Sequence, residues 1–195
     1  SWFLPGFEKE KFSILGYLLA TRKELQRYVT SEGTDEFQIN GHLVEYCAQF
    51  STQIPRNSTK AEQFSRAIIS YLKKNGLHAP DYVWMKIRGR RITISGLGEI
   101  KSHPRVVLRN PSQTSFQRQN VEQMVRNGLL SRLLKTEARI VYERESVNYL
   151  VVPRLGVNRS FYLPPGMPVG WEIREIEFSF QDLMFLKPLL LADPK

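Results

Sequence analysis

The sequence has little of what staples or anchors a small protein. Its 195 residues contain one cysteine, Cys47, so no disulfide can form within the chain. A lone thiol fits a reducing compartment, and a cytoplasmic or nuclear location is expected. The chain lacks an apolar run of about 18 residues and a secretory signal pattern, so neither a spanning helix nor a membrane partner is expected.

Several kinds of catalytic or metal site also lack the residues they need. His42 and Cys47 have no third or fourth partner at zinc-ligand spacing, which argues against a structural zinc site. The segment SGLG, residues 95–98, lacks the further glycine and lysine of a phosphate-cradling loop and is not a nucleophile elbow. A serine hydrolase, a nucleotide-binding enzyme and a Cys/His enzyme are therefore set aside.

Positive charge is what the chain has in excess. The net charge is +9, and residues 60–159 alone hold nineteen Lys or Arg against seven Asp or Glu, a balance of +12. A localised basic excess indicates a polyanionic partner, because each neutralised phosphate releases counterions and adds affinity. The alternative is that scattered Lys and Arg side chains only keep the surface soluble.

Apolar spacing predicts a mixed α/β (α+β) fold in which helices flank a central mixed sheet. Helical spacing covers residues 8–29, 59–75 and 113–135, and a terminal helix over 182–191 is expected to be interrupted at Pro188. The first of the two later long helices is predicted to start with a capping box, Thr59 to Glu62, and to stop at Asn75-Gly76. Strand patterns cover residues 82–87, 91–100, 138–143, 148–153 and 171–180.

Two hairpins and a linker are predicted outside residues 80–101. FQINGHLVEY, residues 37–46, reads as a hairpin around Asn40-Gly41, and the strands at 138–143 and 148–153 are predicted to pair across residues 144–147. Residues 51–58 read as a linker. We therefore expect an N-terminal helix-and-hairpin region over 1–57 and a core with a C-terminal strand and helix over 58–195. Because it starts at Ser1 rather than methionine, the chain is expected either to be processed or to be a domain of a larger protein, with other domains or subunits as partners.

The segment PDYVWMKIRGRRITISGLGEIK, residues 80–101, concentrates the chemistry. It reads as a hairpin turning at Arg88-Gly89, so the start of its first strand should lie beside the end of its second. Asp81 should then approach Glu99 and Lys101, which point to one face while Ile100 packs on the other. Two close carboxylates favour a hard divalent cation such as Mg²⁺, and a neighbouring lysine can act on water or on charge at phosphorus.

These residues resemble the signature of the PD-(D/E)XK nuclease superfamily: Pro80-Asp81, a hairpin, then Glu99-Ile100-Lys101. The resemblance covers about half the chain and implies a restriction-endonuclease-like core. It also implies endonuclease activity on nucleic acid, with DNA favoured over RNA as the substrate. It also implies Mg²⁺ or Mn²⁺ held by Asp81, Glu99 and the backbone carbonyl of Ile100, with Lys101 positioning water. Glu62, on the preceding helix, stands where the family often adds a further catalytic, metal-binding acid.

Each of these residues also has a structural interpretation. Asp81 suits a turn after proline, Glu99 and Lys101 suit a solvated pair on one strand, and Glu62 suits helix capping. Glutamines 117, 119 and 123 are typical of an exposed helix face and receive no role. Gly96 and Gly98 predict either a bulge or a place where nucleic acid approaches the backbone.

Nucleic-acid contacts are predicted around the hairpin. The candidates are Lys86, Arg88, Arg90 and Arg91 at its turn, and His103 and Arg105 just beyond the motif. The functional alternative to a nuclease is a nucleic-acid-binding or assembly module that keeps the fold without cleaving.

Overall fold

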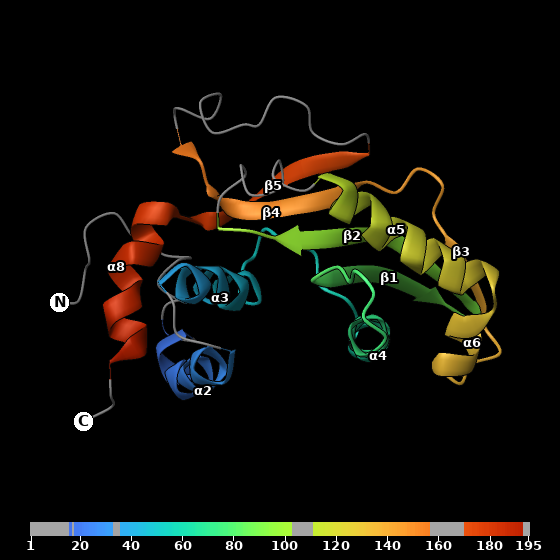
Figure 1. Cartoon of the computed structure of the whole chain (residues 1–195), viewed down its shortest axis with the longest axis horizontal. Coiled ribbons are helices and arrows are strands. Elements are labelled where there is room, and N and C mark those ends of the chain that lie inside the picture. The colour runs from blue at the N-terminus through green and yellow to red at the C-terminus, as the bar shows by residue number, and fades with distance from the viewer. Residues whose placement is uncertain (1–15, 17, 33–35, 103–110, 157–169, 193–195) are drawn as a thin grey trace.

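The computed structural model describes residues 16, 18–32, 36–102, 111–156 and 170–192 (Figure 1). Their helices and strands, in chain order, are α2 (Arg22–Glu32), α3 (Glu36–Ala48), α4 (Thr59–Lys74), β1 (Tyr82–Arg88), β2 (Arg91–Ile100), α5 (Pro111–Arg126), α6 (Leu129–Leu133), β3 (Arg139–Tyr142), β4 (Asn148–Arg154), β5 (Trp171–Ser179) and α8 (Phe180–Leu191). The predicted mixed sheet flanked by helices is thus present. None of the helices in these ranges is long and apolar enough to cross a bilayer.

The sheet is mixed, with strand order β1-β2-β4-β5. Strand β1 runs antiparallel to β2, whereas β4 is parallel to β2 and β5 is parallel to β4. The short strand β3 is also parallel to β2 and pairs with its first half, while β4 pairs with its end. The hairpin predicted between β3 and β4 is therefore wrong. The two strands follow one another along the same edge of β2, and the chain keeps its direction through residues 143–147.

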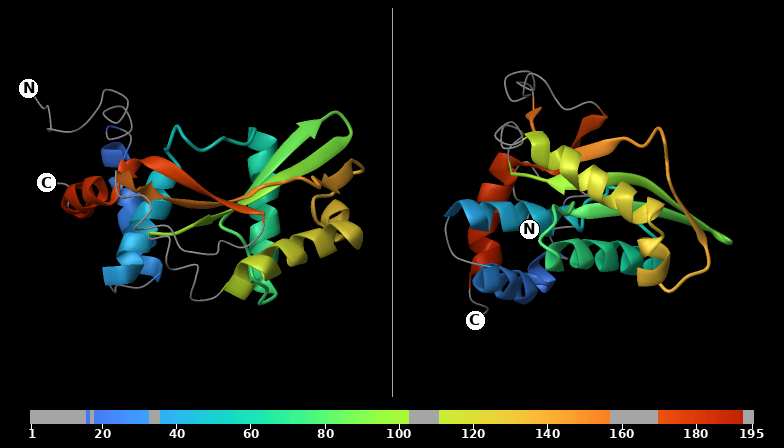
Figure 2. Two further views of the ribbon diagram at one scale, coloured as in Figure 1. Left: turned by 90° about the horizontal axis from the view of Figure 1, so that it is seen from above. Right: turned by 45° about the vertical axis from the view of Figure 1, so that its right-hand side comes forward.

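Two hydrophobic clusters lie on the two faces of this sheet. Val83 and Met85 of β1 belong to a cluster with α4, α5 and α6, whereas Trp84 between them belongs to a cluster with α2, α3 and α8. Alternate residues of a strand point to opposite faces, so the two groups of helices cover opposite sides. In Figures 1 and 2, α2, α3 and α8 gather at one end of the molecule and α4, α5 and α6 at the other.

Before residue 58, the described residues include helices α2 and α3, followed by a connection over 49–57 that is neither helix nor strand. The segment predicted as a hairpin around Asn40-Gly41 lies within α3. Leu43, Val44 and Cys47 recur at helical spacing and are buried, so packing overrides the local turn signal of Asn-Gly. Because α2 and α3 share a cluster with α8, both sides of the predicted boundary at residues 57 and 58 pack on one sheet.

The boundaries of the later helices differ from the sequence prediction in three places. Helix α4 starts with Ser58 as N-cap, whose hydroxyl accepts from the Ala61 N–H at 3.3 Å, so the predicted Thr59–Glu62 capping box is wrong. The predicted helix 113–135 is two helices, α5 and α6, because Gly128 adopts φ +66° between them. Helix α8 continues through Pro188 to Leu191 rather than being interrupted there. The predicted stop at Asn75-Gly76 is confirmed, with Gly76 at φ +66°.

Candidate active site

A β-bulge brings Asp81 opposite Glu99. Strand pairing runs from Arg88↔Arg91 to Met85↔Ile94, and it then resumes at Trp84↔Gly96, one position later on β2. The extra residue is Ser95, and without it Asp81 would stand opposite Gly98. Bulges re-aim the side chains that follow them. Here the phase change turns Leu97 and Glu99 to the face on which Ile92 and Ile94 lie.

Two glycines next to the bulge make room for close packing. A Cβ on Gly98 would lie 2.7 Å from the Trp84 ring, and one on Gly96 would lie 2.8 Å from the carbonyl oxygen of Val147. The bulge that the glycines predict is confirmed. The alternative, a close approach of nucleic acid, does not apply at these two positions, because protein atoms already fill the space.

Asp81 sits where the β1–β2 ladder ends. Its backbone N–H donates to the Gly98 carbonyl at 2.9 Å, and its Oδ2 accepts from the Ile100 N–H at 2.8 Å. No described residue donates to its other oxygen, Oδ1. Burial and the neighbouring charge of Glu99 raise the pKa of Asp81 to about 7, although the Ile100 N–H opposes the shift. The interpretation as a simple turn residue therefore leaves out its main interaction, repulsion from a second carboxylate.

Glu99 is buried and held at both oxygens. Its Oε1 lies 3.0 Å from Lys101 Nζ, and its Oε2 accepts from Gln117 Nε2 at 2.8 Å. Ile100, between Glu99 and Lys101, packs against the cluster on the opposite face, as the alternation predicts. The side chain of Glu99 is 7% exposed and that of Lys101 32%, so the two do not form the freely solvated pair of the structural interpretation.

The charged form of Lys101 is favoured by its surroundings. Burial alone would lower the pKa of its ammonium, but the charge and hydrogen bond of Glu99, with Asp81 and Glu45 adding to them, raise it above its ordinary value. Lys101 is therefore protonated at neutral pH and acts as a donor.

Helix α3 contributes a carboxylate that the sequence analysis missed. Glu45 raises the pKa values of both Asp81 and Lys101 through its charge, and it lines the same cleft as Asp81. His42, one turn earlier, places Nδ1 3.9 Å from Glu45 Oε2. The signal was hidden because the segment was read as a hairpin. As a helix that packs on the end of the sheet, it can direct Glu45 to the motif.

Gln117 is the second residue that received no role. Of the three glutamines, it alone is buried, and besides Glu99 it donates to the Ala79 carbonyl at 3.2 Å. Its Oε1 is buried and has no hydrogen-bond partner among the described residues. The sequence pattern does not identify Gln117, because the neighbouring Phe116 is 46% exposed and Gln117 takes the inward position.

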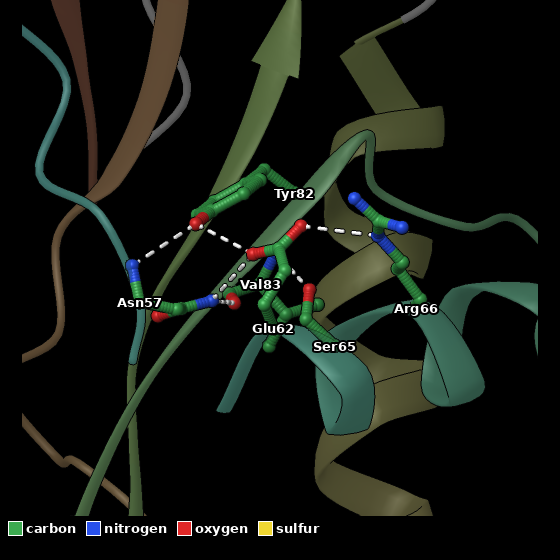
Figure 3. Close-up of polar contacts among 6 residues, drawn as sticks. All are labelled: Asn57, Glu62, Ser65, Arg66, Tyr82 and Val83. Carbon is green, nitrogen blue, oxygen red and sulfur yellow. Dashed lines mark hydrogen bonds and ion pairs between the residues drawn. The ribbon is translucent and has the colours of Figure 1, made fainter. Parts of the chain in front are cut away.

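Glu62 faces the cleft but is engaged by a separate network (Figure 3). Its Oε2 accepts from the Tyr82 hydroxyl at 2.9 Å and from Asn57 Nδ2 at 3.4 Å, and its Oε1 accepts from Arg66 Nε at 3.3 Å. Burial raises the pKa of Tyr82 to about 12, and Glu62 adds to the shift, so the phenol remains a donor. Glu62 is thus fixed at the cleft wall by Tyr82 rather than used in helix capping.

The same network covers the outer edge of β1. Asn57 Nδ2 donates to the Val83 carbonyl at 2.9 Å, Asn57 Oδ1 accepts from the Met85 N–H at 3.0 Å, and Ser65 Oγ accepts from the Val83 N–H at 3.2 Å. The predicted linker 51–58 therefore has a positioning role, because it ties β1 to the start of α4 (Figure 3).

An open cleft of about 1070 Å³ lies beside these groups. Asp81, Glu45, Glu62 and Ile100 line it, together with much of the outer face of α4. Of the three predicted acids, Asp81 and Glu62 therefore lie on the wall of the cleft, whereas Glu99 is buried beside Asp81.

No protein-family model, curated protein or solved structure matches this chain. The function must therefore be argued from the geometry of the cleft.

The predicted nucleic-acid contacts fall in two places. Lys86, Arg88, Arg90 and Arg91 are exposed at the turn of the β1–β2 hairpin. That turn is about 20 Å from Asp81, because the seven residues of β1 rise about 3.3 Å each. Figure 2 shows the turn projecting at the opposite end of the molecule from α3. His103 and Arg105 lie outside the described residues.

The carboxylates at the site are the kind of ligand that Mg²⁺ and Mn²⁺ prefer, although they are few. Within the described ranges, no group of three or more His, Cys, Asp or Glu side chains is arranged to hold a metal ion. Mg²⁺ is commonly held by one or two carboxylates with waters and substrate oxygens. Asp81 and Glu99 repel one another, Asp81 Oδ1 has no donor among the described residues, and the charge of Glu45 adds to theirs. These features favour a cation beside them.

Proposed function

We propose that this chain is a Mg²⁺- or Mn²⁺-dependent endonuclease of the PD-(D/E)XK type that hydrolyses phosphodiester bonds in nucleic acid. The observation that carries the proposal is the bulge in β2, which sets Asp81, at the wall of an open cleft, opposite Glu99, whose carboxylate lies 3.0 Å from Lys101 Nζ. A solvated, purely structural arrangement has no need to bury Glu99 or to hold Asp81 against it.

The order of elements supports the same proposal. Helix α4 precedes the antiparallel pair β1 and β2, helix α5 follows, and β4 then returns parallel to β2. This order resembles the restriction-endonuclease-like core implied by the motif. The strands that carry Asp81, Glu99 and Lys101 at their ends are β1 and β2, the first two strands of the described chain. No strand lies in the described residues between α4 and β1.

The cation would be held by Asp81, Glu99 and the Ile100 carbonyl, and the charge of Glu45 also acts on Asp81. When bound, it would supply a Lewis acid that polarises the scissile phosphate and offsets the repulsion of the carboxylates. Two hydrogen bonds that orient the carboxylates support this role: the Ile100 N–H donates to Asp81, and Gln117 donates to Glu99.

Lys101 acts as an electrostatic donor rather than as a base. Its raised pKa keeps it protonated, so it cannot take a proton from water at neutral pH. As an ammonium it can orient the attacking water and stabilise the negative charge that grows on the phosphate oxygens. Hydrolysis adds water across one P–O bond, and the leaving oxygen receives a proton from solvent.

The proposal is tested by nicking of plasmid DNA and of labelled single-stranded RNA, with Mg²⁺, with Mn²⁺ and with EDTA. We expect cleavage only with a divalent cation, and loss of at least 100-fold in rate for Lys101→Ala, the size typical of losing one charge-stabilising donor. The matched control is Lys23→Ala, which removes an exposed lysine of α2 away from the cleft and should leave the rate unchanged.

Three outcomes are informative. Cleavage that persists in EDTA, or in Lys101→Ala, would refute the mechanism. A protein that binds nucleic acid tightly but cleaves neither substrate would favour the alternative, a binding or assembly module with the same fold.

A further inference from the structure

The cleft has a second, basic part beyond its acids. Arg66, Lys73 and Lys74 of α4 line it together with Arg56 of the preceding connection. We infer that the sugar–phosphate backbone of the nucleic acid lies along the exposed face of α4, contacting Arg66, Lys73 and Lys74, and not over the β1–β2 turn. The inference rests on the proposed function and assigns the path of its substrate.

Helical geometry aligns the basic residues with the acids. Positions 62, 66, 69 and 73 follow the i, i+4, i+7, i+11 spacing, so they form one stripe on the helix surface. All four of these residues line the cleft. The stripe from Glu62 to Lys73 is about 16 Å long, which is equivalent to about five nucleotides along the axis of a duplex strand.

The charges on the stripe are available to a ligand. Lys73 and Lys74 are exposed and make no ion pair within the described ranges. Arg66 pairs with Glu62, but the Arg66 side chain is 79% exposed, and such pairs contribute little. A phosphate can therefore take up Arg66 without a large loss.

The arginines of the hairpin turn are also exposed, but they lie away from the cleft. Arg88 and Arg91 stand directly opposite one another in the ladder, and neither lines the cleft. The cleft therefore connects the acids with the basic residues of α4, and it does not connect them with the turn.

The test compares two variants that each remove two positive charges. Lys73→Gln/Lys74→Gln alters α4, and the matched control Arg88→Gln/Arg90→Gln alters the turn. Both are made in a Lys101→Ala background so that Mg²⁺ can be present, and binding of a fluorescent 12-base-pair duplex is measured from 0.05 to 0.3 M salt.

We expect the α4 variant to bind about 60-fold more weakly at 0.1 M salt. The slope of log K against log salt should become shallower by about 1.8, since each phosphate contact on a duplex contributes about 0.9. The turn variant should bind within about two-fold of its parent. Thermal midpoints should agree to within a few degrees, because all four side chains are exposed.

The inference is overturned if the turn variant loses affinity and the α4 variant does not, or if both bind like the parent. Absence of binding by the parent at 0.05 M salt overturns it as well. Failure of the proposed function is a separate result: the unmodified chain would bind along α4 but would not nick DNA or RNA.

Discussion

Replacing Asp81 with Asn should stabilise the protein in a way that depends on pH. The pKa of this carboxyl is raised from 3.8 to about 7 by burial and by Glu99, so the folded state binds its proton more tightly than the unfolded chain does. The ionised form therefore costs stability, and the cost grows as the pH rises from about 4 to 7 and is constant above that.

The full difference between the two pKa values corresponds to at most ~4 kcal/mol. The realised gain should be smaller, about 1–3 kcal/mol at pH 8, because Asp81 is only partly buried and Asn gives up a charge-assisted bond from the Ile100 N–H. Near pH 4 the native carboxyl is neutral, and the advantage of Asn should disappear.

Urea unfolding in EDTA at pH 4.5, 6 and 8 measures this dependence directly. The exposed Glu145→Gln serves as the control and should show no comparable trend. Adding Mg²⁺ should then stabilise the unmodified chain more than the Asn variant, which has lost a ligand. A variant that is equally destabilised at all three pH values would show that Asp81 is not held against a second charge, and the reasoning would fail.

Three other predictions concern the surroundings of the site. Gly98→Ala should destabilise by about 2 kcal/mol or more and lower cleavage, since its methyl would lie 2.7 Å from the Trp84 ring; chemical denaturation and nicking would show it, and wild-type behaviour in both would contradict the packing. Gln117→Ala should lower cleavage more than binding, because Glu99 loses the donor that orients it; equal losses in both assays would count against a positioning role. Ser58→Ala should cost about 1 kcal/mol through loss of the α4 N-cap, read from the urea midpoint, with Thr59→Ala as a near-neutral control.

Much of the fold was readable because local patterns and packing agree there. The strands of the β1–β2 hairpin, the strand at 171–179 and the end of α4 at Asn75-Gly76 each carry strong local signals, and each is present. Prediction went wrong where packing outweighed a local signal. Asn40-Gly41 favours a turn, yet burial of the flanking apolar residues keeps α3 helical.

The candidate site was readable only in part, for a related reason. Glu99, Lys101 and Asp81 are close in sequence, so the hairpin, with its bulge at Ser95, brings them together. Glu45 reaches the cleft through tertiary packing, and no spacing rule along the chain connects it with the motif. The sequence around Gln117 suggests a surface position, because an amide is usually exposed. Only the packing of α5 on the sheet shows that Gln117 is buried while Phe116 is exposed.

The side chains that cover β1 also have a consequence for the behaviour of the protein in concentrated solution. Within the described sheet β1 is an edge strand, and an uncovered edge is a template on which another chain can add a strand. Asn57 and Ser65 satisfy the backbone groups of Val83 and Met85 that such a chain would need. Asn57→Ala would therefore expose an unpaired strand edge beside Asp81 and Glu99, and its first effect should be self-association that increases with protein concentration.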